Sequence, residues 1–242
     1  MTALAPSFFW KSGALWTPST PGNLLAWWDA NTGLSLTGSR VTAWNDQSGN
    51  GHHLSEFSGL GPTYAATGWN SAKPTVQFGG TNVFLRNVTT SIYSYPNGTG
   101  TPITIFATVN ATTGSTGALL HWFEDPGVSD TYTFGILNSD ALRVYDGATD
   151  HSGSAAATGR KRIAYTYDGS TLKGYVGSGT ADFTVGSLSI VKAGLTRMYM
   201  GAIWNLTQKW QGDVSEVIVY SAALSAAHVA SYVSYSNTKW AG

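Results

Sequence analysis

Polar and apolar positions alternate along most of the chain, with the period of two that is typical of strands buried on one face. Gly, Asn and Asp interrupt this pattern every ten residues or so, which is the spacing of turns in an antiparallel sandwich. Residues 103–109 alternate less cleanly, as expected for a buried central strand. The pattern predicts about a dozen strands, at residues 24–29, 40–45, 75–78, 84–87, 103–109, 118–123, 131–137, 142–145, 162–167, 172–176, 198–201 and 214–220.

A single helix is predicted near the end of the chain. Ser225 is a natural N-cap, because a serine hydroxyl accepts a hydrogen bond from a free backbone N–H group of the first turn. Val229, Tyr232 and Val233 then form an apolar face at helical spacing. The predicted fold is therefore all-β, with one short C-terminal helix.

The segment 44–54 is predicted to be a rigid corner between two strands. Asp46 precedes Ser48-Gly49-Asn50-Gly51, residues that favour turns or tolerate a positive φ. Its carboxylate is expected to accept hydrogen bonds from the N–H groups of this loop. His52 and His53 follow the turn and are expected to bond to it.

Two blocks of sequence resemble those of concanavalin A-like, laminin G-type domains. The first runs from Trp27-Trp28-Asp29-Ala30 to Asp46-Gln47-Ser48-Gly49-Asn50-Gly51. The second joins Gly212-Asp213-Val214-Ser215-Glu216-Val217-Ile218-Val219-Tyr220 to Ala223-Leu224-Ser225. The resemblance implies a concanavalin A-like jelly-roll β-sandwich. This fold hosts lectins, glycosidases, lyases and adhesion modules, so the resemblance does not select one activity. The family usually has Glu where this chain has His228, which alters the expected capping box.

The composition narrows the classes of partner. Charged residues make up 11% of the 242 residues and the net charge is zero, whereas binding to nucleic acid or to anionic lipid needs a basic patch. Neither nucleic acid nor membrane is therefore expected as a partner. The chain has no cysteine, and its start lacks the pattern of a signal peptide. A virion surface or another extracellular setting would reconcile these features; a processed or excised secreted domain remains the alternative.

Residues 1–21 are predicted to be an arm, and residues 22–242 a single β-sandwich domain. Phe8, Phe9, Trp10 and Trp16 lie among prolines in this arm without a regular period. Exposed aromatic residues often mark interfaces. The arm is expected either to pack on its own domain or to dock on a virion or surface protein; both interpretations stay open, as does a homo-oligomer.

Catalysis by a pair of carboxylates is not expected. Glycoside cleavage needs two carboxyl groups about 5–9 Å apart across a groove. Glu124 and Asp125 are adjacent, and on a continuous strand Asp213 and Glu216 would point to opposite faces. The five histidines also lack the spacing of a known triad. A polysaccharide-active glycosidase or lyase remains the alternative.

A structural calcium ion is the one cofactor considered. Relatives in the family often bind calcium at the rim of the sandwich through Asp side chains and carbonyl groups. The chain has no Asp-x-Asp-x-Asp run, and an Asp in a glycine-rich turn usually stabilises the turn itself. Turn positions that could contribute are Asp46, Asp125, Asp130, Asp146 and Asp150.

Aromatic residues give the best candidate binding site. The chain has ten Trp and twelve Tyr, more than a core usually requires. Sugar rings pack their apolar faces on aromatic planes, and amide or carboxylate groups bind their hydroxyls. The predicted glycan site consists of Trp122, Asp125, Trp204, Asn205 and Trp210.

We therefore predict a non-enzymatic, lectin-like adhesion or decoration protein on a bacteriophage virion, able to bind host-surface glycan. A secreted bacterial carbohydrate-binding module is the alternative that keeps the same site.

Overall fold

Strands account for most of the structure, a computed structural model that describes residues 16–87, 92, 100–114, 116–124, 131–137, 139–188 and 195–241. These residues form seventeen strands and one helix. In chain order they are β1 (Leu24–Asp29), β2 (Leu34–Thr37), β3 (Arg40–Trp44), β4 (Leu54–Glu56), β5 (Thr63–Trp69), β6 (Lys73–Gly79), β7 (Leu85–Asn87), β8 (Ile103–Ala111), β9 (Gly117–Phe123), β10 (Thr131–Ile136), β11 (Ala141–Tyr145), β12 (Asp150–Ala156), β13 (Gly159–Tyr167), β14 (Leu172–Val176), β15 (Ala181–Val185), β16 (Arg197–Met200), β17 (Gln211–Tyr220) and α1 (Ala226–Lys239).

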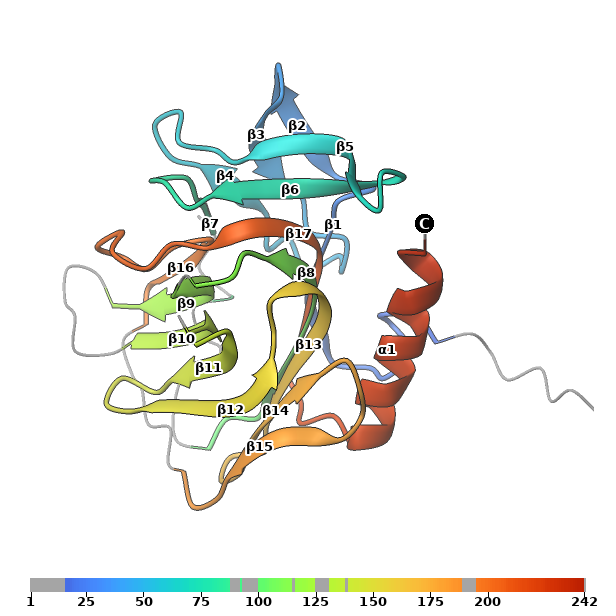
Figure 1. The fold of residues 1–242 in the computed structure, drawn as a ribbon, viewed down its shortest axis with the longest axis vertical. Helices are drawn as coiled ribbons and strands as arrows, with labels where there is room; N and C mark the ends of the chain where they lie inside the picture. The colour runs from blue at the N-terminus through green and yellow to red at the C-terminus, as the bar shows by residue number, and fades with distance from the viewer. Residues whose placement is uncertain are drawn as a thin grey trace, which may run out of the picture.

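The strands pair antiparallel in two layers (Figure 1). One layer, which we call the helix-side sheet, has the order β5-β6-β17-β8-β13-β14-β15, with β1 paired to the second half of β17. The other, the outer sheet, has the order β4-β7-β16-β9-β10-β11-β12. β2 and β3 continue from β4, and a single pairing of β3 with β5 connects the two layers at one end.

The main hydrophobic core lies between the two sheets. Trp122 and Phe134 of the outer sheet are buried there with Tyr165 of the helix-side sheet. The rings of Phe134 and Tyr165 meet edge to face, with 5.2 Å between their centroids. The Tyr165 hydroxyl donates a 2.8 Å hydrogen bond to the carbonyl of Gly135, across the core. The prediction of a concanavalin A-like β-sandwich is confirmed.

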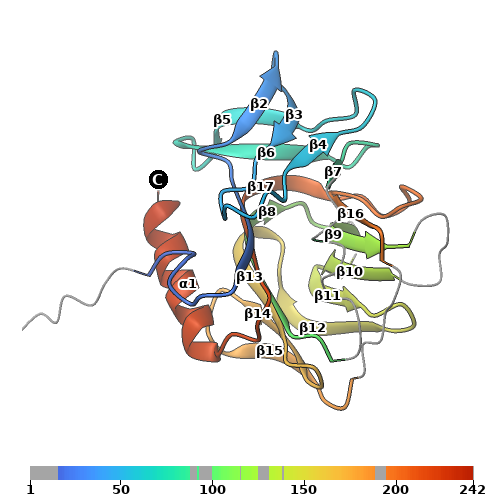
Figure 2. The ribbon, with the colours of Figure 1, turned by 180° about the vertical axis from the view of Figure 1, so that it is seen from behind.

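A second, smaller core lies between the helix-side sheet and α1 (Figure 2). Phe106 and Tyr220 of the sheet pack there with Val229 and Tyr232 of the helix. The predicted N-cap is confirmed, since the Ser225 hydroxyl accepts a 3.4 Å hydrogen bond from the His228 N–H group. The His228 ring lies 3.1 Å from the same hydroxyl, so it does not return a bond to the Ser225 backbone as a glutamate would in a capping box.

Four strands escape prediction: β2, β5, β12 and β15; β4 is the strand that follows the predicted corner at residues 44–54. β5, β12 and β15 lie at sheet edges, where one face or both faces contact water. β12 consists of Asp150–Ala156 and contains no large apolar residue. Its strand conformation comes from hydrogen bonding to β11, a signal that hydrophobic periodicity does not carry.

The Asp46 corner is confirmed in detail. The Asp46 carboxylate accepts hydrogen bonds from the N–H groups of Trp27 (2.9 Å), Ser48 (2.8 Å) and His52 (3.0 Å). The Asp46 N–H group in turn donates to His53 Nδ1 over 3.1 Å. One buried carboxylate thereby ties β1 to the turn that follows β3.

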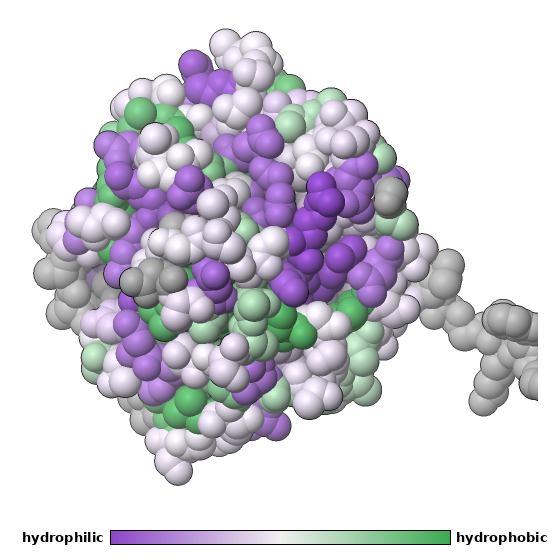
Figure 3. Space-filling view, in the orientation of Figure 1, coloured by the Kyte–Doolittle hydropathy of each residue, from purple (hydrophilic) through white to green (hydrophobic). Residues whose placement is uncertain are grey.

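The surface is polar without being strongly charged. On the face seen in Figure 3, apolar residues form small separate patches among polar ones. Among the residues that the structure describes, three large apolar side chains are exposed: Leu36, Phe57 and Trp204. No helix in the described part of the chain is long and apolar enough to cross a membrane.

Candidate functional site

A row of polar side chains crosses the outer face of the outer sheet. His121 on β9 pairs with Thr133 on β10, and Thr133 pairs with Tyr145 on β11. Their neighbours in sequence, Trp122 and Val144, are buried in the core between the sheets. Because successive side chains of a strand point to opposite faces, His121, Thr133 and Tyr145 lie side by side on the face away from the core.

A loop between β16 and β17 covers this row. This loop, Gly201–Trp210, which we call the pocket loop, is closed by a bridge between Ala202 and Lys209. Gly201 has φ +96°, and a Cβ atom there would lie 2.3 Å from the Phe78 ring. Only glycine allows the chain to turn here.

Side-chain hydrogen bonds fix the shape of the pocket loop. The Asn205 carbonyl oxygen accepts from the Thr207 N–H group (3.1 Å) and from the Thr207 hydroxyl (2.6 Å). A main-chain bond adds to these, from the Ile203 N–H group to the backbone carbonyl of Gln208 over 3.0 Å. Trp204 is held at the tip of this turn, with 43% of its surface exposed.

The row and the loop enclose a pocket of about 340 Å³. This volume lies at the lower end of the range for small-ligand sites, roughly 300–1,000 Å³. The outer sheet supplies the floor and the pocket loop supplies the wall. The lining residues are His121, Thr133, Arg143, Tyr145, Ile203, Trp204, Asn205, Thr207 and Gln208.

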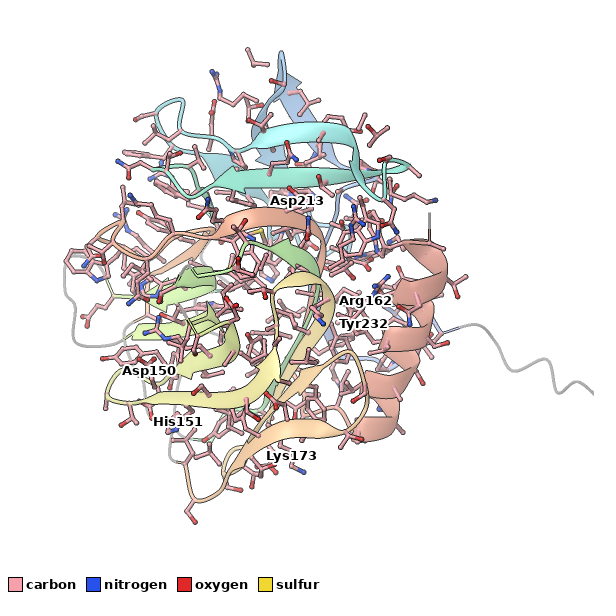
Figure 4. All side chains as sticks on the ribbon, in the orientation of Figure 1. Asp150, His151, Arg162, Lys173, Asp213 and Tyr232 are labelled. Atoms are coloured by element: carbon pink, nitrogen blue, oxygen red, sulfur yellow. The ribbon has the colours of Figure 1, made fainter. Side chains whose placement is uncertain are left out.

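Arg143 connects the floor to the wall. Its Nε donates to the Asp150 carboxylate on β12, and its Nη1 donates to the Gln208 carbonyl oxygen of the pocket loop. Arg143 is 4% exposed, whereas Asp150 lies on the edge strand β12, with 43% of its side chain exposed (Figure 4). The guanidinium is therefore buried, and its counter-ion faces water.

His121 is buried and neutral at physiological pH. Burial lowers the pKa of its imidazole to about 3; a hydrogen bond to the Tyr132 backbone opposes this shift, and the positive charge of Arg143 adds to it. Nδ1 lies 2.9 Å from the Thr133 hydroxyl. Nε2 is buried and has no hydrogen-bond partner among the described residues. A buried polar atom of this kind is costly unless a ligand or water bonds to it.

The predicted glycan-binding residues divide into three groups. Trp204 and Asn205 line the pocket. Trp122 and Trp210 are 0% exposed, so their rings pack in the core and offer no plane to a sugar; for these two the prediction is corrected. Asp125 lies outside the described residues.

The floor of the pocket is not among the residues predicted from the sequence. It consists of His121, Thr133, Arg143 and Tyr145. A signal is present in the alternation along β9, β10 and β11, where His121, Thr133 and Arg143 each stand between two core positions. What the alternation does not give is the pairing of the three strands, which brings the residues together.

The aromatic residues of the arm are described only from Trp16 onward. The Trp16 ring packs on Phe106, Tyr232 and Tyr235, with centroid distances of 6.2, 6.0 and 5.0 Å. The Tyr220 hydroxyl donates to the Pro18 carbonyl over 2.7 Å. This end of the arm therefore packs on its own domain. Phe8, Phe9 and Trp10 lie outside the described residues.

Carboxylates gather on the opposite side of the molecule, under α1. Asp213 pairs with Asn110 and Glu216 with Thr108, because a bulge at Ser215 interrupts β17. The bulge places Asp213 and Glu216 on the same face, which corrects the expectation for a continuous strand. Glu216 is 0% exposed and is bonded to Lys239 Nζ over 2.6 Å.

Two of the aspartates considered for calcium, Asp46 and Asp146, serve the protein's own turns, and Asp150 lies on β12 and is bonded to Arg143. Asp46 stabilises the corner described above. Asp146 accepts from the N–H groups of Ala148 (2.8 Å) and Thr149 (2.7 Å) and contacts His151 Nε2 over 2.8 Å. Burial opposes the shift, but the bond from His151 and those two N–H groups lower the pKa of Asp146 overall. Asp125 and Asp130 lie outside the described residues, and no cluster of three metal-binding side chains occurs within the described ones.

Comparison with known proteins agrees with this architecture. A family model described as the concanavalin A-like lectin/glucanases superfamily matches residues 70–230, more than half of the chain. The chain belongs to this superfamily. A comparison with curated protein sequences gives no significant match.

Solved structures with the superfamily's fold resemble the chain at low sequence identity. Domain 4 of AbnA, an extracellular arabinanase from Geobacillus stearothermophilus solved in complex with arabinotriose, gives a TM-score of 0.59 at 14% identity. That match covers 86% of this chain and 97% of the arabinanase domain. A Trypanosoma rangeli sialidase in complex with sialic acid gives 0.62 at 15% identity, covering 94% of this chain. The chain spans only 34% of that sialidase, and at such identities the likeness shows the fold alone.

Proposed function

We propose that this protein is a non-enzymatic carbohydrate-binding module and that the pocket beneath Trp204 is its binding site. The observation that carries the proposal is one exposed indole at the rim of a polar pocket. An exposed Trp plane suits the apolar face of a sugar ring. The amides of Asn205 and Gln208 and the hydroxyls of Thr133 and Tyr145 suit sugar hydroxyls.

The membership of the chain in a superfamily of lectins and glucanases supports this proposal. The arabinanase domain, which matches the chain over nearly its whole length, was solved with an oligosaccharide. Binding without catalysis is supported by the lining of the pocket, whose described residues include no Asp or Glu. Glycoside hydrolysis usually requires two carboxyl groups at the scissile bond.

The experiment is a glycan-array screen of the full chain, followed by calorimetric titration of the best ligand. Trp204→Ala is expected to weaken binding about 5- to 150-fold, by analogy with the stacking of a base on an aromatic side chain, which is worth about 1–3 kcal/mol. Leu36→Ala is the matched control, since Leu36 is 42% exposed on β2, outside the pocket.

Equal binding by the wild type and Trp204→Ala would contradict the proposed site. Release of reducing ends from a bound polysaccharide would contradict the non-enzymatic part and would favour a glycosidase or lyase. Absence of binding to any glycan would favour a purely structural domain.

The proposed setting is a virion or other extracellular surface, with the arm docking on a neighbouring protein. The charge-poor composition and the aromatic residues Phe8, Phe9 and Trp10 support it. Light scattering after size-exclusion chromatography, on the full chain and on a chain that starts at Gly22, tests the arm. Assembly of the full chain alone supports docking, and identical monomers would contradict self-association through the arm.

A further inference from the structure

The charges that line the pocket are unbalanced. Its described lining contains one guanidinium, that of Arg143, and no carboxylate. His121 adds no charge at neutral pH, because burial keeps its pKa at about 3. The only permanent charge on the pocket surface is therefore positive, in a protein whose net charge is zero.

The counter-ion of Arg143 does not cancel this charge inside the pocket. Asp150 is not a lining residue, and it lies on the edge strand with 43% of its side chain in contact with water. Water screens an exposed carboxylate far more than a buried guanidinium. Gln208, the other partner of Arg143, is neutral. An anion in the pocket would thus face an incompletely compensated cation in a region of low dielectric.

The hydrogen-bonding groups of the pocket loop are also biased toward donors. The Asn205 carbonyl oxygen already accepts two bonds from Thr207, and the Gln208 carbonyl oxygen accepts from Arg143. An amide whose oxygen is engaged still offers its two N–H groups. Arg143 also has donors beyond the two it uses, since a guanidinium carries five. Donors and a cation together are what a carboxylate requires.

We propose that the pocket selects a sugar that carries a carboxylate, such as a hexuronic acid, over the neutral sugar of the same stereochemistry. This inference rests on the proposed function, since it concerns the same pocket. The sugar ring stacks on Trp204, and its carboxylate accepts hydrogen bonds from Arg143 and from the side-chain amides of Asn205 and Gln208.

The experiment titrates the full chain with matched pairs of oligosaccharides, oligogalacturonate against its carboxyl-reduced galactan counterpart and oligoglucuronate against its glucan counterpart. Acidic ligands are expected to bind at least tenfold more tightly at low salt, and the preference is expected to shrink as salt is added. Gln208→Glu is the decisive variant. It keeps the shape of the side chain and the bond from Arg143, but it places a carboxylate in the pocket. The acidic preference, measured as the ratio of the affinities for the acidic and the neutral partner, is expected to disappear in this variant, because the new carboxylate repels an acidic ligand.

Gln211→Glu provides the matched control, because it makes the same charge change at an exposed position on β17, in the other sheet. It is expected to keep the acidic preference. Thermal melts of both variants show whether the fold is intact. Arg143→Lys keeps the positive charge but lacks the planar guanidinium, so it tests whether charge alone is sufficient for the acidic preference.

Three outcomes are distinguishable. Tighter acidic binding that Gln208→Glu abolishes and Gln211→Glu preserves supports the inference. Equal or tighter binding of the neutral partner, lost in Trp204→Ala, overturns the inference and leaves the proposed function in place. Binding of neither class overturns both.

Discussion

The two outer faces of this sandwich are covered in different ways. On the helix-side sheet, α1 covers a second core and a set of charges whose members all have protein partners. On the outer sheet, the pocket loop covers a similar row of polar side chains but leaves a cavity beneath it. The comparison is close, because each face contains one buried charge network linking neighbouring elements.

The networks differ in how completely the protein satisfies them. Glu216 accepts bonds from Trp27 Nε1 (2.9 Å), the Tyr235 hydroxyl (3.0 Å), Lys239 Nζ (2.6 Å) and Trp240 Nε1 (3.2 Å). Under the pocket loop, by contrast, His121 Nε2 has no partner among the described residues; on the helix face the comparable atom, Trp16 Nε1, lies outside the charge network. A fully bonded buried network stabilises one structure, whereas an incompletely bonded one is ready to accept a ligand. This difference supports the proposal that the helix face serves stability and the pocket face serves recognition.

Removal of Lys239 is the strongest test of this division. Lys239 Nζ bonds Asp29 (2.7 Å) as well as Glu216, so Lys239→Met leaves two buried carboxylates without a cation. Breaking a buried ion pair in this way costs about 3–5 kcal/mol. Urea unfolding is expected to show this loss, and glycan affinity at a temperature where the variant is folded is expected to stay unchanged. Lys173→Met, on β14 near the other edge of the same sheet (Figure 4), is the matched control, and its change in unfolding free energy is expected to be near zero. A loss as small as the control's would contradict a stabilising role for the network.

The fold could be predicted from the sequence because its signal is local. Apolar alternation marks twelve of the strands, and Ser225 marks the start of the helix. The buried network under α1 could not be predicted in this way. Glu216 and Lys239 meet because the bulge at Ser215 shifts the register of β17. A bulge changes the phase of the side-chain period, but Val217–Tyr220 are all apolar, so the change cannot be located from the sequence.

Acidification is expected to act on the pocket face through His121. The folded pKa of His121 is about 3, below the ordinary value of 6.5, so the unfolded chain binds the proton more tightly. The stability that neutral His121 supplies is complete above pH 6.5 and is lost as pH falls toward 3. One such group removes about 2 kcal/mol between pH 7.5 and pH 5.

His121→Gln isolates this effect, because the difference in unfolding free energy between wild type and variant removes the contribution of every other group. This difference in unfolding free energy is expected to decrease by about 2 kcal/mol between pH 7.5 and pH 5. A difference for His121→Gln that stays constant with pH would show that folding does not lower the pKa of His121.

The pocket was only half predictable for a physical reason. Trp204 and Asn205 could be selected because an aromatic residue followed by a polar one, near a predicted strand end, is conspicuous in the sequence. Trp122 and Trp210 also lie near strand ends and are nevertheless in the core, because residue type does not reveal which face of a strand a side chain occupies. Arg143 escaped notice since its partners, Asp150 and Gln208, are brought to it by strand pairing and by the pocket loop.

The smallest expected effect concerns the start of α1. Ser225→Ala removes the hydroxyl that accepts from the His228 N–H group, and loss of such a cap costs about 1 kcal/mol. Ser225→Asp is expected to restore most of it, because a carboxylate also caps and favours the positive end of the helix. Ser234→Ala, at an exposed position within the helix, is the control and should not destabilise, since alanine is the better helix former. Since α1 covers the face opposite the pocket, none of the three changes is expected to alter glycan affinity. A change in affinity with Ser225→Ala, measured by the same titration, would show that the two faces are coupled and that stability and recognition are not divided between them.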